Sequence, residues 1–422
     1  TQRYTFDGNY QFLDTAAFRL NLMSHESNVA GRDEVNYDRW GVAPSLVFGL
    51  GTPTRLSLDY YHVESDDLPD SGIPYSLKSG GTGTRTSANP DKPTDGGRSS
   101  NYYGLVDRDF YKTRADIATL AIEHDLNDAL TIKNTLRHGN TLQDFIYSQP
   151  DDSKGNILVG EVWRRPNNRV SNTRTTTNQT DLFGEFYLGG LKNSFSTGIE
   201  LSREESERSS YTVDTDTVPG GSANSNCTPG MIGASSGYNC TSLSNPNPDD
   251  PWNGNIARNY AGTDTKSNTR ALYVFDTLEL TPDWLLNMGL RYDHFDTQYR
   301  TYDAAGATVV NSKGVASKGR DTSEFITGQL GLVWKPAENG SIYVSYATSA
   351  TPPGGNNFQL SAAAGNINNS ALDPQETESV ELGTKWEGLL ALRARVVKEL
   401  ENLRTDGKIG SSLQGTATLH LP

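Results

Sequence analysis

Hydrophobic and polar side chains alternate with a period of two along much of this chain, which is the spacing of β-strands. In residues 16–23, Ala16, Phe18, Leu20 and Leu22 alternate with small or polar residues. The same alternation recurs at intervals over most of the chain. It predicts thirteen strands, at about residues 1–12, 16–25, 39–49, 55–64, 111–124, 129–140, 173–188, 194–205, 267–280, 284–297, 321–335, 341–349 and 376–386.

The connections between these strands are short and long in strict turn. The short ones are tight turns such as 13–15, 125–128 and 281–283. Outer-membrane barrels place short turns at one end and long loops at the other, whereas a soluble sandwich has no reason to do so. The pattern therefore predicts an all-β fold, a transmembrane antiparallel β-barrel. The long connections cover about residues 26–38, 65–110, 141–172, 206–266, 298–320 and 350–375.

Composition agrees with a barrel wall. Hydrophobic residues make up only 34% of the 422 residues and the mean hydropathy is −0.60, yet the chain has 20 Tyr, 13 Phe and 41 Gly. A barrel exposes only every second residue to lipid, so its mean hydropathy stays low. The chain contains no run of about 18 apolar residues, so no transmembrane helix is expected. The alternative is a set of half-buried strands in a soluble sheet, which would show the same alternation.

The net charge and the cysteine content limit which partners the protein can bind and in which compartment it can lie. The formal net charge of −14 argues against binding nucleic acid through its phosphates. Both cysteines, Cys227 and Cys240, lie in one polar stretch rich in Gly, Ser and Asn. Two cysteines so placed predict a disulfide in an oxidising compartment. Two free thiols are the alternative.

The sequence contains few residue arrangements that are typical of enzyme active sites. Its six histidines have no metal-ligand spacing, and the cysteines form no C-x-x-C pair. No phosphate-binding loop, dinucleotide fingerprint or nucleophile elbow occurs in a strand-to-helix context. We therefore expect no catalytic residue, no metal site and no enzymatic activity.

Several segments resemble TonB-dependent siderophore receptors of the catecholate, monomeric ferric siderophore branch. They are AAFRLNLMSHESNVAGRDEV at 16–35, YVFDTLELTPDWLLNMGLRYDHFDT at 273–297, GSIYVSYATSATPPGGNNFQLS at 340–361 and LDPQETESVELGTKWE at 372–387, together with residues 39–75. The resemblance covers residues 1–387. It implies a barrel of about 22 strands around an N-terminal plug whose TonB box engages TonB.

The resemblance also implies partners and departures from the pattern. The partners are a ferric siderophore, the TonB–ExbB–ExbD system acting through the plug, and outer-membrane lipid with lipopolysaccharide. No cofactor is expected, because iron enters already chelated. The plug, the first strand and the last strands are absent, so we expect about 13 of about 22 strands and no transport by this chain alone.

Residues 388–422 differ from the rest. Apolar residues recur there at spacings of three and four, at Leu389, Leu392, Val396 and Leu400. This spacing predicts an amphipathic helix. This stretch resembles the C-terminal region of isoleucyl-tRNA synthetase. We expect a foreign-looking helical tail after the barrel segment; a genuine helical insertion is the alternative.

The resemblance implies an extracellular site for a rigid, aromatic, trianionic ferric tris-catecholate. Aromatic rings and arginines in the long loops suit such a ligand through stacking, cation–π contact and charge pairing. For each of these residues, the alternative is a solvent-exposed loop side chain that binds no ligand. A passive or structural barrel of the porin or adhesin kind, or a secreted all-β binding protein, is the alternative for the whole chain. The candidate ligand residues are Arg32, Tyr102, Tyr103, Trp163, Arg164, Arg165, Asn356 and Phe358.

Overall fold

The structure is a computed structural model that is built almost wholly of β-strands. It describes residues 1–70, 72–76, 92–93, 97–151, 156–214, 240–252, 254–310, 317–353, 369, 372–386 and 398. The predicted tail lies outside this part of the chain apart from Lys398. Within the described residues, no helix is long and apolar enough to cross a membrane.

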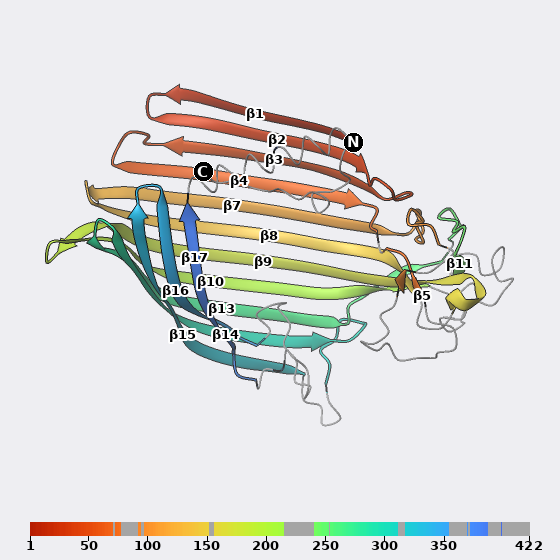
Figure 1. Cartoon of the computed structure of the whole chain (residues 1–422). Helices are drawn as coiled ribbons and strands as arrows, with labels where there is room; N and C mark the ends of the chain where they lie inside the picture. Colours follow the sequence, from red (N-terminus) through yellow and green to blue (C-terminus); the bar gives the residue numbers. More distant parts are fainter. Residues whose placement is uncertain are drawn as a thin grey trace, which may run out of the picture.

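Thirteen long strands form one antiparallel sheet in which each pairs with its neighbours in sequence. The predicted meander is therefore confirmed. The sheet is curved, with the short turns at one end and the described parts of the long connections at the other (Figure 1). The strands are β1 (Gln2–Leu13), β2 (Ala16–Asn28), β3 (Asn36–Phe48), β4 (Thr54–Asp67), β7 (Phe110–Asn127), β8 (Leu130–Asp151), β9 (Glu161–Leu188), β10 (Leu191–Val213), β13 (Gly262–Thr281), β14 (Trp284–Tyr302), β15 (Lys318–Ala337), β16 (Gly340–Thr351) and β17 (Gln375–Trp386).

Short elements occupy the long connections. Two small strands, β5 (Tyr75–Ser76) and β6 (Lys92–Pro93), pair with each other. A 3-10 turn, η1 (Asn156–Val159), joins β8 to β9. The strands β11 (Cys240–Ser242) and β12 (Ile256–Asn259) pair with β9 and β10.

Several strands are much longer than the sequence pattern predicts. The expected loop at 141–172 is mostly a continuation of the β8–β9 hairpin, which pairs from Leu130 opposite Gly184 to Asp151 opposite Trp163. The apolar alternation stops where lipid contact stops, but backbone pairing continues beyond that point. The loop boundaries predicted for this segment were therefore wrong.

The two faces of the sheet differ in chemistry and in crowding. On the apolar face Leu290 is 58% exposed and Ile326 is 70% exposed, whereas on the other face Ala271 and Asp293 are 7% and 4% exposed. Curvature crowds side chains on the concave side and spreads them on the convex side. The apolar face is therefore the convex, lipid-facing one, and the polar face is the concave lining of the barrel.

The lipid-facing band has the height that a membrane needs. On β14 the band runs from Trp284 to Tyr292, eight residues further along, at a rise of about 3.4 Å per residue. At a strand tilt of about 40°, this length spans about 20 Å along the membrane normal. Trp284 stacks on Trp334 at the turn end, with ring centroids 5.8 Å apart. At the opposite boundary Trp40 lies 4.5 Å from the His62 ring. Aromatic rings therefore mark both interfaces, as expected for a barrel in lipid.

The concave face is crowded because aromatic rings lie across glycines. Tyr273 is the register partner of Gly198, and a β-carbon at Gly198 would lie 2.8 Å from that ring. The Tyr273 hydroxyl donates to Asp181, and Gln179 donates to the same hydroxyl at 2.7 Å. This wall therefore carries a hydrogen-bonded polar network at membrane depth, on the side away from lipid.

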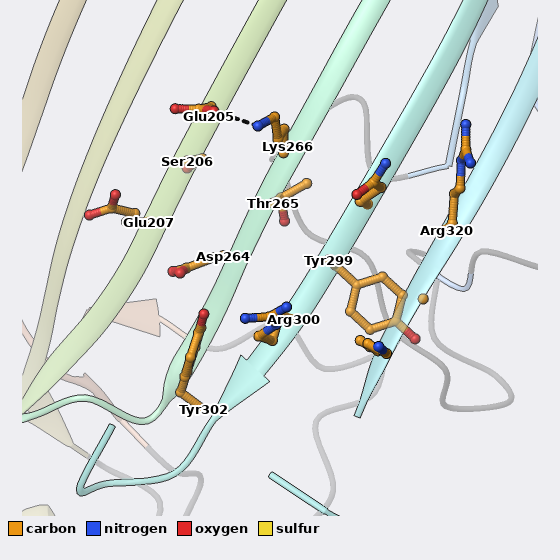
Figure 2. Close-up of a pocket in the computed structure, with 13 residues that line it drawn as sticks. Glu205, Ser206, Glu207, Asp264, Thr265, Lys266, Tyr299, Arg300, Tyr302 and Arg320 are labelled. Atoms are coloured by element: carbon orange, nitrogen blue, oxygen red, sulfur yellow. Dashed lines mark ion pairs between the residues drawn. The ribbon is translucent and has the colours of Figure 1, made fainter. Parts of the chain in front are cut away.

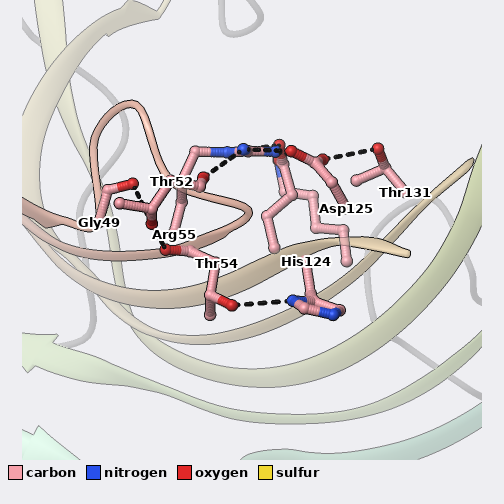
Figure 3. A network of polar contacts seen from close by, with 9 residues as sticks. Gly49, Thr52, Thr54, Arg55, His124, Asp125 and Thr131 are labelled. Carbon is pink, nitrogen blue, oxygen red and sulfur yellow. Dashed lines mark hydrogen bonds and ion pairs between the residues drawn. The ribbon is translucent and has the colours of Figure 1, made fainter. Parts of the chain in front are cut away.

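Polar contacts also tie the turn end together (Figure 3). Arg55 of β4 donates to Asp125 and to Glu123, each at 2.6 Å. Thr131 of β8 donates to the same Asp125 at 2.9 Å. Three strands and two turns are therefore linked by one guanidinium and one carboxylate.

The two faces give a direct test of the membrane assignment. Leu330→Arg places a charge in the middle of the lipid-facing band, so the intact protein should lose about 2–4 kcal/mol of folding free energy. The neighbouring Gln329→Arg faces the concave wall between Gly289 and Ala347 and should cost little. Urea titration of folding into lipid vesicles measures both variants. Equal losses would contradict the assignment of faces.

Candidate functional site

Above the lipid-facing band, the concave face of β7 and β8 carries a stack of aromatic rings. Tyr111 stacks on Phe145 with ring centroids 5.1 Å apart and planes 8° from parallel. Tyr147 lies 5.4 Å from Phe145. Period-two alternation places these side chains together, since Tyr111 and Phe145 are direct register partners. Gln143 donates to the Tyr111 hydroxyl and holds one end of the stack.

Two guanidiniums lie beside this stack. Arg169 is the register partner of Phe145, and its Cζ lies 5.9 Å from the ring centroid. Arg208 follows on β10, opposite Ser171 of β9. Burial lowers the pKa of Arg208, and the charge of Arg169 adds to this effect. Among the described residues neither arginine has a carboxylate within ion-pair distance, so both cations are available to an anionic ligand.

The predicted run Trp163, Arg164 and Arg165 divides between the two faces of the hairpin. Trp163 and Arg165 lie on the same side as Phe145, and Arg165 donates to Gln149 at 2.6 Å. Arg164 points the opposite way. All three belong to strand β9 rather than to a loop, so alternation separates neighbours in the sequence.

Arg164 anchors the loops. Its side chain is fully buried, with Nη1 2.7 Å from Asp250 and Nε donating to the Tyr103 carbonyl at 3.0 Å. Its Nη2 donates to the Asn247 carbonyl. A buried cation with these partners links strand β9 to two loops that are distant in sequence.

Tyr102 and Tyr103 belong to the same loop core. Tyr103 packs with Ile157, Val162 and Leu243, and its hydroxyl donates to the Leu243 carbonyl at 2.7 Å. Burial raises the pKa of both tyrosines, and the charge of Asp109 adds to this effect at Tyr102. Both rings are at most 2% exposed. In this structure Tyr102, Tyr103 and Arg164 therefore hold the loops together and present no surface to a ligand.

The remaining predicted residues have separate surroundings. Arg32 pairs with Asp70 at 2.7 Å and donates to the Ser99 carbonyl, so it links two loop segments. Asn356 and Phe358 lie outside the described residues. Cys240 is disulfide-bonded, but Cys227 lies outside the described part of the chain. The pairing of the two cysteines therefore stays a prediction.

Sequence reasoning missed the residues that form the concave cluster. Phe145, Arg169 and Arg208 fell within segments that were read as loops. Their signal was period-two alternation that continues past the apolar band, as in Phe145 and Tyr147.

Fold and site together define a transmembrane β-barrel wall whose concave face carries a cluster of aromatic and basic residues. Residues 44–396 match the family described as TonB dependent receptor-like, beta-barrel. The chain therefore belongs to the TonB-dependent receptor β-barrel family, and it lies in the bacterial outer membrane. This membership decides against the porin, adhesin and secreted-protein alternatives.

Similar proteins and solved structures support this family assignment. The chain is 37% identical over 409 residues to a probable TonB-dependent siderophore receptor, PiuA, of Acinetobacter baumannii, covering 96% of this chain and 52% of that protein. The crystal structure of PiuA matches with a TM-score of 0.79 at 37% identity, over 91% of this chain and 52% of that one. The closed form of the ferric-catecholate import receptor Fiu from Escherichia coli K12 matches with a TM-score of 0.74 at 32% identity, over 91% and 53%.

The matches differ in how much of each protein they cover. The chain spans about half the length of the curated receptors that it matches. A stretch of 47 residues, 11% of this chain, is 51% identical to an isoleucine–tRNA ligase of Thiobacillus denitrificans, of which it covers 5%. The sequence predicts such a likeness for residues 388–422.

The loop anchor can be tested by its removal. Arg164→Ala leaves Asp250 and two carbonyls without their cation, so the loops should open more easily by about 3–5 kcal/mol. Hydrogen exchange of the amides in 101–109 and 240–250 measures this. Arg165→Ala, at a half-exposed neighbour, should leave that exchange unchanged. Similar exchange in both variants would count against the anchoring role.

Proposed function

We propose that this chain is part of the wall of an outer-membrane receptor for TonB-dependent uptake of ferric catecholate-type siderophores. Two relatives support this proposal, a probable TonB-dependent siderophore receptor and a ferric-catecholate import receptor. The observation that carries the proposal is the aromatic and arginine cluster on the concave face. In this proposal the protein is a transport receptor and not an enzyme.

The chemistry of the cluster suits the ligand. A ferric tris-catecholate presents flat aromatic rings and three negative charges, so ring faces can stack on Phe145 and Tyr147. Arg169 and Arg208 supply charge, and a guanidinium stacked on a ring binds anions without losing its aromatic contact. Trp163 and Arg165 extend the same side of the hairpin. Iron arrives chelated, so the protein needs to supply no metal ligand.

The proposed partners follow from the same role. They are the ferric siderophore, the TonB–ExbB–ExbD system acting through the plug of the complete receptor, and the surrounding outer-membrane lipid and lipopolysaccharide. The polar network around Tyr273 and Asp181 faces the lumen, where a plug would lie. No cofactor is proposed.

Removal of both cluster arginines tests the ligand site. In the complete receptor, Arg169→Ala with Arg208→Ala should weaken ferric-catecholate binding about 10- to 100-fold, because two charge-assisted contacts are lost. The binding that remains should depend less on salt. Fluorescence quenching by the ferric complex across a salt series measures both effects.

A matched control lies on the same two strands. Arg174 and Arg203 face the convex side of β9 and β10, so their double alanine variant removes equal charge without touching the vestibule. Its affinity and salt dependence should match those of the unmodified receptor. Equal weakening in both pairs would show that overall charge, and not the cluster, attracts the ligand.

A further inference from the structure

The pairing between β3 and β4 is interrupted partway along the two strands. Residues 39–42 and 45–48 of β3 pair with β4, whereas Ala43 and Pro44 between them have no partner there. On the other side of β3, both Ala43 and Pro44 pair with β2. The sheet is therefore closed along one side of Pro44 and open along the other.

A single missing donor accounts for this gap. Alternate residues of a strand direct their backbone groups to alternate neighbouring strands, and residue 44 directs its backbone to β4. Proline has no N–H, so the carbonyl of Tyr60, which lies opposite, loses its donor in the ladder. The hydrogen bond from residue 44 to residue 60 belongs to both of the absent pairs, 43–61 and 44–60.

The unpaired carbonyl lies at membrane depth. On β3 the lipid-facing band runs from Phe48 near the turn end to Trp40 at the opposite boundary, and Pro44 is midway between them. A backbone carbonyl without a donor is strongly unfavourable in hydrocarbon, and proline is rare in the interior of a sheet for this reason. The gap is therefore a weak point in the wall.

The sheet is hollowed on both faces of the gap. The concave hollow, of about 510 Å³, is lined by Pro44 and Tyr60 together with polar side chains that include Arg19, Asp59 and Arg137. The convex hollow, of about 440 Å³, is mainly apolar, and Pro44 and Tyr60 line it as well. A polar recess has room for water, which can donate to the free carbonyl from the concave side.

A hollow does not by itself indicate a gap in the pairing. A larger hollow, of about 650 Å³, lies over β10, β13 and β14 (Figure 2). Pairing continues unbroken through it, with Glu205 opposite Lys266 and Asp264 opposite Arg300. The interruption between β3 and β4 therefore comes from the proline and not from the hollow.

Side chains connect the two strands on either side of the gap. Toward the turn end, Ser45 donates a hydrogen bond to its register partner Asp59. Toward the opposite end, the Trp40 ring lies 4.5 Å from the His62 ring. The two strands are thus held together above and below Pro44, which confines any separation to the few residues between these contacts.

We propose that the gap at Pro44 is a flexible joint in the barrel wall, where β3 and β4 separate locally while the flanking pairs stay closed. Bending at this joint changes the curvature of the wall, and with it the width of the lumen during ligand passage. Continuously paired strands resist such bending, because each displacement breaks hydrogen bonds of the ladder. The link to ligand passage rests on the proposed function, whereas the joint itself does not.

Hydrogen exchange in the complete receptor tests the joint without any ligand. The amides of Tyr60 and His62 face β3 beside the gap and should exchange about ten-fold faster than those of Asn21 and Ala43, which pair β2 with β3 at the same level. Pro44→Val supplies the missing donor and should slow the exchange of Tyr60 and His62 about ten-fold. Equal rates for the two sets of amides, or no slowing in Pro44→Val, would overturn the proposal.

The matched control makes the same substitution outside the gap. Pro53→Val replaces an exposed proline in the turn before β4. It should leave the exchange of Tyr60 and His62 unchanged. Equal slowing in the two variants would show a general effect of proline removal and would also overturn the joint.

Cysteines across the gap test the joint even if Pro44→Val fails to fold. Ala43→Cys with Tyr61→Cys places two thiols opposite each other on the concave side, and their disulfide closes the gap. Ferric-catecholate uptake should then fall about ten-fold or more at unchanged binding affinity, and reduction should restore it. Unchanged uptake by the bridged receptor would overturn the role of the joint in ligand passage.

The control for this disulfide lies across an intact pair of strands. Ile117→Cys with Gly139→Cys bridges register partners of β7 and β8 and should leave uptake unchanged in both redox states. Equal loss of uptake in both bridged receptors would show that any cross-link in the wall is inhibitory, which would count against a joint at Pro44. If the unmodified receptor binds no ferric catecholate, the proposed function fails, and the exchange rates alone decide whether the joint exists.

Discussion

In hydrocarbon an unpaired backbone amide or carbonyl costs several kcal/mol, so each strand that crosses the membrane must be paired along its length. The ladder meets this requirement for the strands between β1 and β17, apart from the gap at Pro44, because each of them pairs with a neighbour on both sides. Antiparallel neighbours need only tight turns at one end, where Arg55 and Asp125 bind adjacent turns together. Continuous pairing then fixes the register, and the register fixes the side to which each residue points.

The fixed register produces two chemically different surfaces from one sheet. The convex side presents aliphatic residues at membrane depth and charged residues above it, whereas the concave side presents hydrogen-bonded polar groups and, higher up, aromatic rings with free arginines. The same rule that keeps Leu290 in lipid therefore keeps Phe145 and Arg169 facing the vestibule. The aromatic and basic cluster is separate from the lipid-facing residues because the two sets occupy opposite faces of the same strands.

Beyond the membrane, water can satisfy the backbone, yet the β8–β9 hairpin remains paired. A small buried core supports it, formed by Tyr103, Ile157, Val162 and Leu243 and linked to strand β9 by Arg164. The hairpin thus holds the concave cluster on a rigid support above the lumen. For the ligand proposed above, rigid placement reduces the conformational entropy that is lost on binding.

The sequence by itself determined the strand count, the meander and the lipid-facing side, because a period of two and alternating connection lengths are local properties. Only the tertiary structure decided which aromatic and basic residues lie on the concave face. Trp163, Arg164 and Arg165 are adjacent in sequence, but β9 continues through them, so the middle residue is buried with Asp250 while its neighbours face the concave side. Phe145, Arg169 and Arg208 converge because pairing brings three strands into register, and no local pattern contains that information.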